Sequence, residues 1–405
     1  MSKRQDQDNR SVFSGQLRRA IVDVASRQMP LGIAGRELDD ERLWEILGYA
    51  AVNRMTIESA CHELAQAPSG NTVRAHLAGA LSDRRPKVVK LEEALNATLQ
   101  TQLPKGIRKR LGQTRFEIAM DLHEVPYHGQ PAQDENEVRR GAAKSGTTHF
   151  HAYATLAIVH DRRRYELAVT FVWADETMAE VVERLLAYKN RLKLRVRRAY
   201  LDKGFCAQAV FSVLRSHRLP YIIPIPVRGK QNGRGVYQGG IGVLFRGRRG
   251  YFTRYTFKAG LPDAYTTQVA LVRVVSAGRY GRRRTVWFAY AVYGVGHIQP
   301  HQIFTLYRRR FGIESGYRQL EQVRARTASP SPALRLLLVG LALIILNVYL
   351  TLRQVWLTVQ VYGSRLRRVW LTLRRMTLLL SRLLEQLLGV APLQISRARA
   401  VALFS

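Results

Sequence analysis

The spacing of apolar residues changes along the chain. Up to about residue 115 they recur at helical intervals, most clearly in ERLWEILGYAAV (41–52) and VVKLEEALNATL (88–99). Between about 115 and 228, short runs rich in β-branched and aromatic residues replace that spacing, and helical spacing returns from about residue 299. The pattern predicts a helical N-terminal region followed by an α/β region.

The residue pattern of the α/β region predicts three strands, a helix, a strand, a helix and a strand, in that order. The first three strands are predicted to be antiparallel. This order is typical of a mixed sheet flanked by helices. The predicted strands cover 115–121, 148–160, 164–174, 193–202 and 220–227, and the predicted helices cover 176–192 and 207–219.

Residues 229–296 form a separate Gly-rich, basic stretch with further strand-like segments, among them TVWFAYAV (285–292). We interpret it as an inserted β-rich subdomain. Trp287 is interpreted as a core tryptophan, with stacking on a displaced DNA base as the alternative.

The segment 56–81 has the pattern of a helix-turn-helix. Thr56 can cap a first short helix, APSG (67–70) is a turn, and Asn71 or Thr72 can cap a second helix. The start of the second helix of such a motif meets base edges, and an ordinary helical hairpin is the alternative. The residues predicted to contact DNA here are Asn71, Thr72, Arg74 and His76.

The apolar segment 336–352 is long enough to be considered for a membrane span, since about 20 apolar residues cross a bilayer. Arg335 and Arg353 flank it equally and give no orientation signal. A helix buried inside a globular domain has the same pattern, and we expect that. A single-span membrane protein is the alternative.

Charge narrows the choice of partners. The 405 residues carry a formal net charge of +34, and the basic residues recur along the whole chain rather than in one tail. Nucleic acid is the usual partner of such a chain. Two cysteines, Cys61 and Cys206, make no disulfide framework, and the N-terminus has no apolar signal sequence. We therefore expect a cytoplasmic, nucleoid-associated, DNA-binding protein without membrane attachment.

Two aspartates are candidates for catalysis. Asp121 and Asp202 each end a predicted strand. A single aspartate at such a position more commonly starts a turn. If the two strands are neighbours, however, both acids meet in one cleft at the edge of the sheet.

A third acid, Glu314, lies in the basic stretch YRRRFGIESGYRQLE (307–321). At helical spacing Tyr307, Arg310, Glu314 and Glu321 share one stripe. Two aspartates and a glutamate are suited to two Mg²⁺ or Mn²⁺ ions that catalyse phosphoryl transfer. Arg310 would then face a phosphate, and Tyr307 would hydrogen-bond to DNA or stack on it.

AMDLHEVPYHG (119–129), AYLDKGF (199–205) and the stretch 307–321 together resemble the three acidic motifs of DDE transposases from insertion sequences. The subgroup has an RNase H-like core with a β-strand insertion and a Tyr-Arg-Glu-Lys signature. Tyr307, Arg310 and Glu314 match that signature, whereas Glu321 stands at the lysine position.

The resemblance implies a catalytic triad of Asp121, Asp202 and Glu314 with two metal ions, and a helix of the RNase H-like core at 336–352. It also implies binding to terminal inverted repeats, transfer of the freed 3′-hydroxyl to target DNA, and a homodimer. A nuclease without joining activity and a non-catalytic DNA-binding derivative are the alternatives. The expected division is 1–114 (helical, DNA-binding), 115–228 and 297–353 (RNase H-like core), 229–296 (insertion) and 354–405 (basic tail).

Overall fold

The computed structural model describes residues 15–161, 163–233, 236–277, 283–311, 318–355, 357–362 and 365–392. It divides into two compact units, each described here by itself. One unit is Leu103–Arg318 and contains the large sheet. The other combines Met1–Gln102 with Gln319–Ser405 and is mostly helical.

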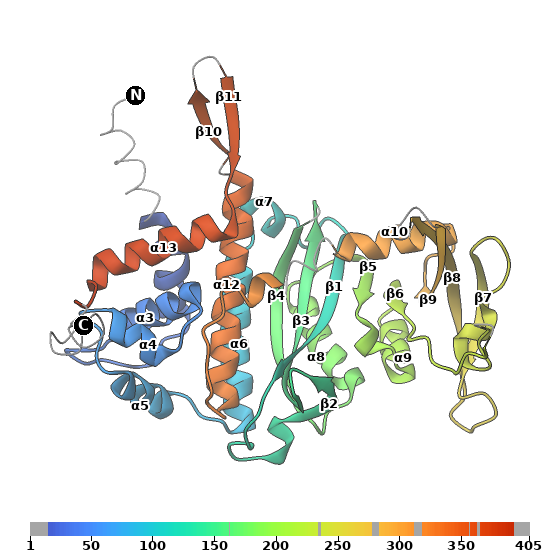
Figure 1. Ribbon diagram of the computed structural model, residues 1–405, viewed down its shortest axis with the longest axis horizontal. Coiled ribbons are helices and arrows are strands. Elements are labelled where there is room, and N and C mark those ends of the chain that lie inside the picture. The colour runs from blue at the N-terminus through green and yellow to red at the C-terminus, as the bar shows by residue number, and fades with distance from the viewer. Residues whose placement is uncertain are drawn as a thin grey trace, which may run out of the picture. The chain divides into compact units, whose positions relative to one another are not determined.

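The large sheet has nine strands in the described part of the chain, in the order β2-β3-β1-β5-β6-β9-β8-β7, with β4 paired to β3 (Figure 1). β1 is antiparallel to β3 and parallel to β5, β3 is antiparallel to β4, and β6 is parallel to β5. The succession β4-β3-β1-β5-β6 is the RNase H-like arrangement, which confirms the predicted fold class. The strands are β1 Phe116–Pro126, β2 Arg139–Lys144, β3 Thr147–His160, β4 Arg163–Val172, β5 Val196–Leu201, β6 Tyr221–Pro224, β7 Tyr251–Phe257, β8 Tyr265–Ala277 and β9 Arg283–Tyr293.

Helices cover both faces of this sheet. Tyr221 of β6 stacks on Phe211 of α9 (Gln208–Ser216), 5.8 Å between ring centroids. The next residue, Ile222, belongs instead to a buried cluster with Tyr307 of α10 (Pro300–Phe311). Because neighbouring residues of a strand point to opposite faces, α9 and α10 lie on opposite faces. α8 (Met178–Arg191) packs against β4 and α9.

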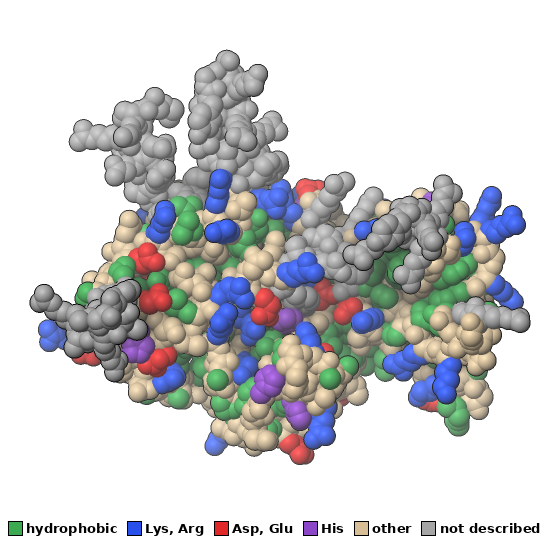
Figure 2. All heavy atoms as spheres, viewed as in Figure 1, with side chains coloured by type: hydrophobic (Ala, Val, Ile, Leu, Met, Phe, Trp, Pro, Cys, Tyr) green, Lys and Arg blue, Asp and Glu red, His purple; other side chains and the backbone are tan. Residues whose placement is uncertain are grey.

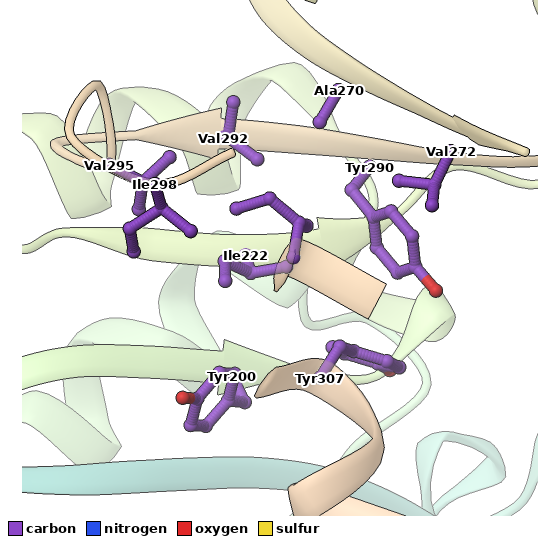
Figure 3. Close-up of a cluster of buried hydrophobic side chains, with 10 residues drawn as sticks. Tyr200, Ile222, Ala270, Val272, Tyr290, Val292, Val295, Ile298 and Tyr307 are labelled. Carbon is purple, nitrogen blue, oxygen red and sulfur yellow. The ribbon is translucent and has the colours of Figure 1, made fainter. Parts of the chain in front are cut away.

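The cluster beneath α10 joins strands that are far apart in sequence (Figure 3). Tyr200 of β5, Ile222 of β6 and Tyr290 of β9 meet Tyr307 of α10. Burial of these large side chains fixes α10 against the sheet, because each buried aromatic side chain removes a large apolar area from water. The buried members of this cluster are Tyr200, Ile222, Ala270, Val272, Tyr290, Val292, Val295, Ile298, Ile303 and Tyr307.

The stretch predicted as a separate insertion extends the central sheet. β9 pairs antiparallel with β6, and β8 and β7 follow outward. The β content was predicted, but the pairing with β6 was not, because strand pairing depends on partners distant in sequence. Trp287 is half-buried and stacks on Phe245, 5.8 Å between centroids with the planes 7° apart.

The helical unit is built around α12 (Pro332–Val355), which packs against α6 (Arg85–Thr101) and α3 (Asp40–Asn53). By length and composition alone, α12 could span a membrane. However, 89% of its most apolar 18-residue stretch is buried inside the protein. The predicted buried helix is therefore present. In this structure α12 lies in the same compact unit as the N-terminal helices.

The expected basic tail is also part of the helical unit. After the hairpin β10 (Leu357–Tyr362) and β11 (Arg365–Trp370), α13 (Leu373–Leu388) packs against α3. Tyr49 of α3 donates a hydrogen bond to Glu385 of α13 at 3.2 Å. The described part of 354–405 thus lies in one compact unit with the N-terminal helices.

Two short helices, α4 (Ile57–Glu63) and α5 (Gly70–Ala80), lie where the helix-turn-helix was predicted. Thr56 caps α4, as expected, with its side chain accepting from the Ser59 amide at 3.1 Å. Ser69, not Asn71 or Thr72, caps α5, so α5 begins earlier than predicted. A Cβ at Gly70 would come within 2.8 Å of the Glu58 Cα, so glycine is needed for the close approach of the two helices.

Candidate active site

Asp121 and Asp202 lie at adjoining positions of neighbouring parallel strands. Met120 of β1 pairs with Leu201 of β5, and the Asp202 amide donates to the Met120 carbonyl at 3.1 Å. Each aspartate directly follows this last pair. The structure thus confirms that the two strands are neighbours and that their aspartates lie side by side.

The local setting of Asp121 differs from the prediction. β1 does not end at Asp121 but continues to Pro126, because β3 pairs with it over its whole length beyond that point. What ends at Met120 is the pairing with β5. Asp121 therefore lies in mid-strand, where the departure of β5 opens one side of β1.

Asp121 points to the face of the sheet that α10 covers. Glu117, four residues earlier on β1, accepts a hydrogen bond from the Tyr200 hydroxyl at 2.9 Å. Tyr200 belongs to the cluster beneath α10. Since residues four apart on a strand share a face, Asp121 is on this face too.

Arg164 of β4 forms a buried ion pair with Asp121. Arg164 Nη2 also donates to the hydroxyl of Thr155, directly opposite Asp121 on β3, at 2.6 Å. Its Nε lies 2.5 Å from Oε1 of Glu166, a second buried carboxylate. Arg164, Thr155 and Glu166 were not predicted to belong to the site. The alternation of side chains along β4 places Arg164 and Glu166 on one face of the sheet. Only the pairing of β3 with both β1 and β4 brings these two residues close to Asp121.

Asp202 lies in an environment that disfavours its charged form. Burial raises the pKa of the Asp202 carboxyl, and the Lys203 amide hydrogen bond, Lys203 and Arg164 oppose that rise. Asp202 Oδ1 accepts from the Lys203 amide at 2.7 Å. The influence of Arg164 on both aspartates agrees with their adjacent positions.

Tyr307 is a core residue, which corrects its predicted contact with DNA. Its side chain is 2% exposed, and its hydroxyl donates to the Leu201 carbonyl at 3.2 Å. Burial, with the Asp202 charge nearby, raises the pKa of Tyr307, so the hydroxyl stays protonated. The ring cannot stack on DNA from this position. It joins α10 to the end of β5 instead.

The remaining residues of the predicted helix motif are described only in part. Glu314 and the side chain of Arg310 lie outside the described residues. Glu321 forms an ion pair with Arg324 at 2.9 Å, within the helical unit.

Asp121 and Asp202 have the chemistry that a divalent metal requires. Mg²⁺ and Mn²⁺ prefer carboxylate oxygens as ligands. Among the described residues there is no cluster of three or more metal-binding side chains. The third predicted ligand, Glu314, lies outside that range. The two aspartates thus fit part of a metal site.

α5 presents the predicted DNA-contacting side chains to solvent. Asn71, Arg74 and His76 are exposed and Thr72 is half-buried, while Val73 and Leu77 anchor the opposite side. Arg74 contacts Asn71 and forms an ion pair with Glu58 of α4 at 3.0 Å. Thr72 and His76 also line a groove of about 690 Å³ beside residues 31–34.

The RNase H-like sheet thus carries two aspartates side by side, at the point where the pairing of β1 with β5 ends. Residues 115–348 match the family model of the transposase DDE domain, and the chain belongs to this family. The match covers the RNase H-like sheet and both aspartates.

Among solved structures, the chain is similar to the piggyBac transposase in a synaptic complex with hairpin DNA, with 10% sequence identity and a TM-score of 0.49. The alignment covers 96% of this chain and 82% of that one. No curated protein matches the sequence.

Proposed function

We propose that this transposase cuts DNA at the ends of an insertion sequence and joins the freed 3′-hydroxyls to target DNA. The observation that carries the proposal is the adjacency of Asp121 and Asp202, both inside the family-matched region. Two carboxylates on one side of a rigid sheet can hold a reacting phosphate group in a fixed position through bound cations.

The residues of the proposed active site have separate roles. Asp121, Asp202 and Glu314 would hold two Mg²⁺ or Mn²⁺ ions, which when bound stabilise the attacking and leaving oxygens of phosphoryl transfer. Tyr307 stays protonated in the core and supports the end of β5, next to Asp202. Arg310 would contact a DNA phosphate. These roles make Tyr307, Arg310 and Glu314 the counterparts of the first three members of the Tyr-Arg-Glu-Lys signature.

DNA is the proposed partner in both steps. The net charge of +34 favours a long polyanion, and Lys and Arg side chains are spread over the face seen in Figure 2. The exposed side of α5, with Asn71, Arg74 and His76, would recognise the terminal inverted repeats. A homodimer would cut two ends together, and the protein would act in the cytoplasm at the nucleoid.

A strand-transfer assay with the element's own end DNA tests this proposal. The full-length protein, labelled end DNA and a target plasmid are incubated with Mg²⁺, and products are separated on denaturing gels. We expect cut ends and covalent end–target products. Cutting without joining would favour the nuclease alternative, and binding without cutting would favour the non-catalytic alternative.

A further inference from the structure

Arg164 is shared between two buried carboxylates beside the proposed metal site. Arg164, Asp121 and Glu166 are 6%, 2% and 7% exposed. Glu166 engages the guanidinium with both oxygens, Oε1 with Nε at 2.5 Å and Oε2 with Nη2 at 3.3 Å. Nη1 is directed to Asp121. The single guanidinium therefore bridges a predicted metal ligand and a second acid.

A second arginine on the same face shows how this arrangement differs from an ordinary ion pair. Arg198 pairs with Glu117 at 3.3 Å, one cation to one carboxylate. Around Arg164 two carboxyl groups share one cation, and burial raises the pKa of Glu166, because full ionisation of both acids would leave excess negative charge in a buried place. Such charge is costly unless a further cation balances it. The Arg164 cluster is thus suited to accept a cation at Asp121.

We propose that Arg164 is a counter-ion that holds Asp121 before metal binds and is retained by Glu166 when Asp121 turns to the metal. This inference rests on the proposed metal-binding role of Asp121. Glu166 is then a positioning residue, not a ligand, because both of its oxygens face the guanidinium. Without Glu166, Arg164 would remain on Asp121 and compete with the metal for it.

The geometry supports this division of roles. Glu166 contacts the guanidinium at Nε and Nη2, whereas Asp121 contacts it at Nη1, so the two contacts with Glu166 do not depend on the contact with Asp121. Thr155 fixes Nη2 at 2.6 Å and so keeps the guanidinium in place. Partners that orient a metal ligand in this way typically change metal affinity by about 10–100-fold when they are replaced.

The test measures metal binding without catalysis. The full-length protein is titrated with Mn²⁺, and free Mn²⁺ is followed by electron paramagnetic resonance. A double variant, Asp121→Asn with Asp202→Asn, defines the background. Glu166→Gln removes the charge, whereas Glu166→Asp keeps the charge but shortens the side chain, so that it loses the bidentate contact. Glu117→Gln, in the ion pair with Arg198 on the same face, is the matched control. Thermal melting verifies the folding of each variant.

We expect Glu166→Gln to raise the half-saturating Mn²⁺ concentration of the Asp121-dependent site by about tenfold or more. Glu166→Asp should raise it in the same direction, and Glu117→Gln should leave it unchanged. The inference is overturned if Glu166→Asp binds like the wild type, because loss of charge alone would then explain Glu166→Gln. It is also overturned if neither Glu166 variant changes the midpoint, or if Glu166→Gln falls to the background, which would make Glu166 a ligand. Equal binding by the wild type and the double aspartate variant would instead refute the proposed metal site itself.

Discussion

The hydroxyl of Tyr307 donates a hydrogen bond to the carbonyl of Leu201, the residue that precedes Asp202. The Tyr307 ring also packs edge-on to Tyr200 at 6.5 Å and against Tyr290 at 5.2 Å. α10 is therefore attached to the strand that carries one of the two proposed metal ligands. Any movement of α10 would disturb the backbone beside Asp202.

Tyr307→Phe should weaken this attachment without changing DNA affinity. Removal of one buried hydrogen bond costs about 0.5–1.5 kcal/mol of unfolding free energy, while the aromatic packing is kept. We expect a lower unfolding midpoint, slower DNA cutting, and unchanged binding in a gel-shift assay. Tyr255→Phe, on β7, is a control for the loss of a hydroxyl. A large loss of DNA affinity in Tyr307→Phe would restore the contact with DNA expected from the sequence.

α12 should be sensitive to added volume at its contact with α6. A Cβ at Gly340 would lie 2.3 Å from Leu95 Cδ2 and 3.0 Å from its Cγ, and Leu95 is buried. Gly340→Leu is therefore expected to destabilise the protein by at least about 1–3 kcal/mol in urea unfolding. Gly79→Ala is the control, because nothing lies within 4 Å of its added Cβ on α5. Equal stability of both variants would contradict tight packing of α12.

Much of the fold could be predicted from apolar spacing. The strands β3 and β4 and the helices α3, α6 and α8 begin and end close to their predicted limits, because their patterns are long and regular. β2 was missed, since its sequence, RRGAAK, has few β-branched or aromatic residues and is mostly exposed.

The candidate site could be predicted only in part. The positions of Asp121 and Asp202 after apolar strands indicated a shared edge, and the pairing of β1 with β5 confirms that they adjoin. Arg164 could not be assigned, because its link to Asp121 depends on two strand pairings whose registers the sequence does not specify. Tyr307 was placed on DNA because its helical stripe was known, while the direction of that stripe relative to the sheet was not.

Arg74→Ala is expected to reduce sequence discrimination. If Arg74 contacts a base edge, its removal should cost about 1–3 kcal/mol of preference for end DNA over random DNA. Competition gel shifts with both DNAs measure this preference. Arg27→Ala, at an exposed site on α2 (Val24–Gln28), is the control. An equal loss on both DNAs would show that Arg74 contacts phosphate only.

Salt should weaken DNA binding steeply. Each phosphate neutralised by Lys or Arg releases bound counterions, so the logarithm of the association constant falls linearly with the logarithm of salt concentration. With a net charge of +34, we expect a slope corresponding to several phosphate contacts. Fluorescence anisotropy at increasing KCl measures it. A flat response would remove the electrostatic argument for a polyanionic partner.

Replacement of any of the three predicted metal ligands should abolish DNA cutting but leave DNA binding intact. Asp121→Asn, Asp202→Asn and Glu314→Gln each replace a carboxylate by a neutral amide, which is a weaker ligand for Mg²⁺. Each variant should bind DNA as the wild type does, or slightly more tightly, because one negative charge near the phosphates is lost. Asp202→Asn should also not lower the unfolding midpoint, since burial disfavours its charged form.

The most direct measurement is single-turnover cutting of end DNA in Mg²⁺ by the wild type, these three variants and two controls. Glu117→Gln removes a carboxylate of a neighbouring ion pair, and Glu321→Gln removes one that pairs with Arg324. Thermal melting and gel shifts accompany every variant. We predict that Asp121→Asn, Asp202→Asn and Glu314→Gln fold, bind DNA and do not cut, while both controls cut. Cutting at the wild-type rate by Asp121→Asn or Asp202→Asn would contradict the assignment of the active site to this pair.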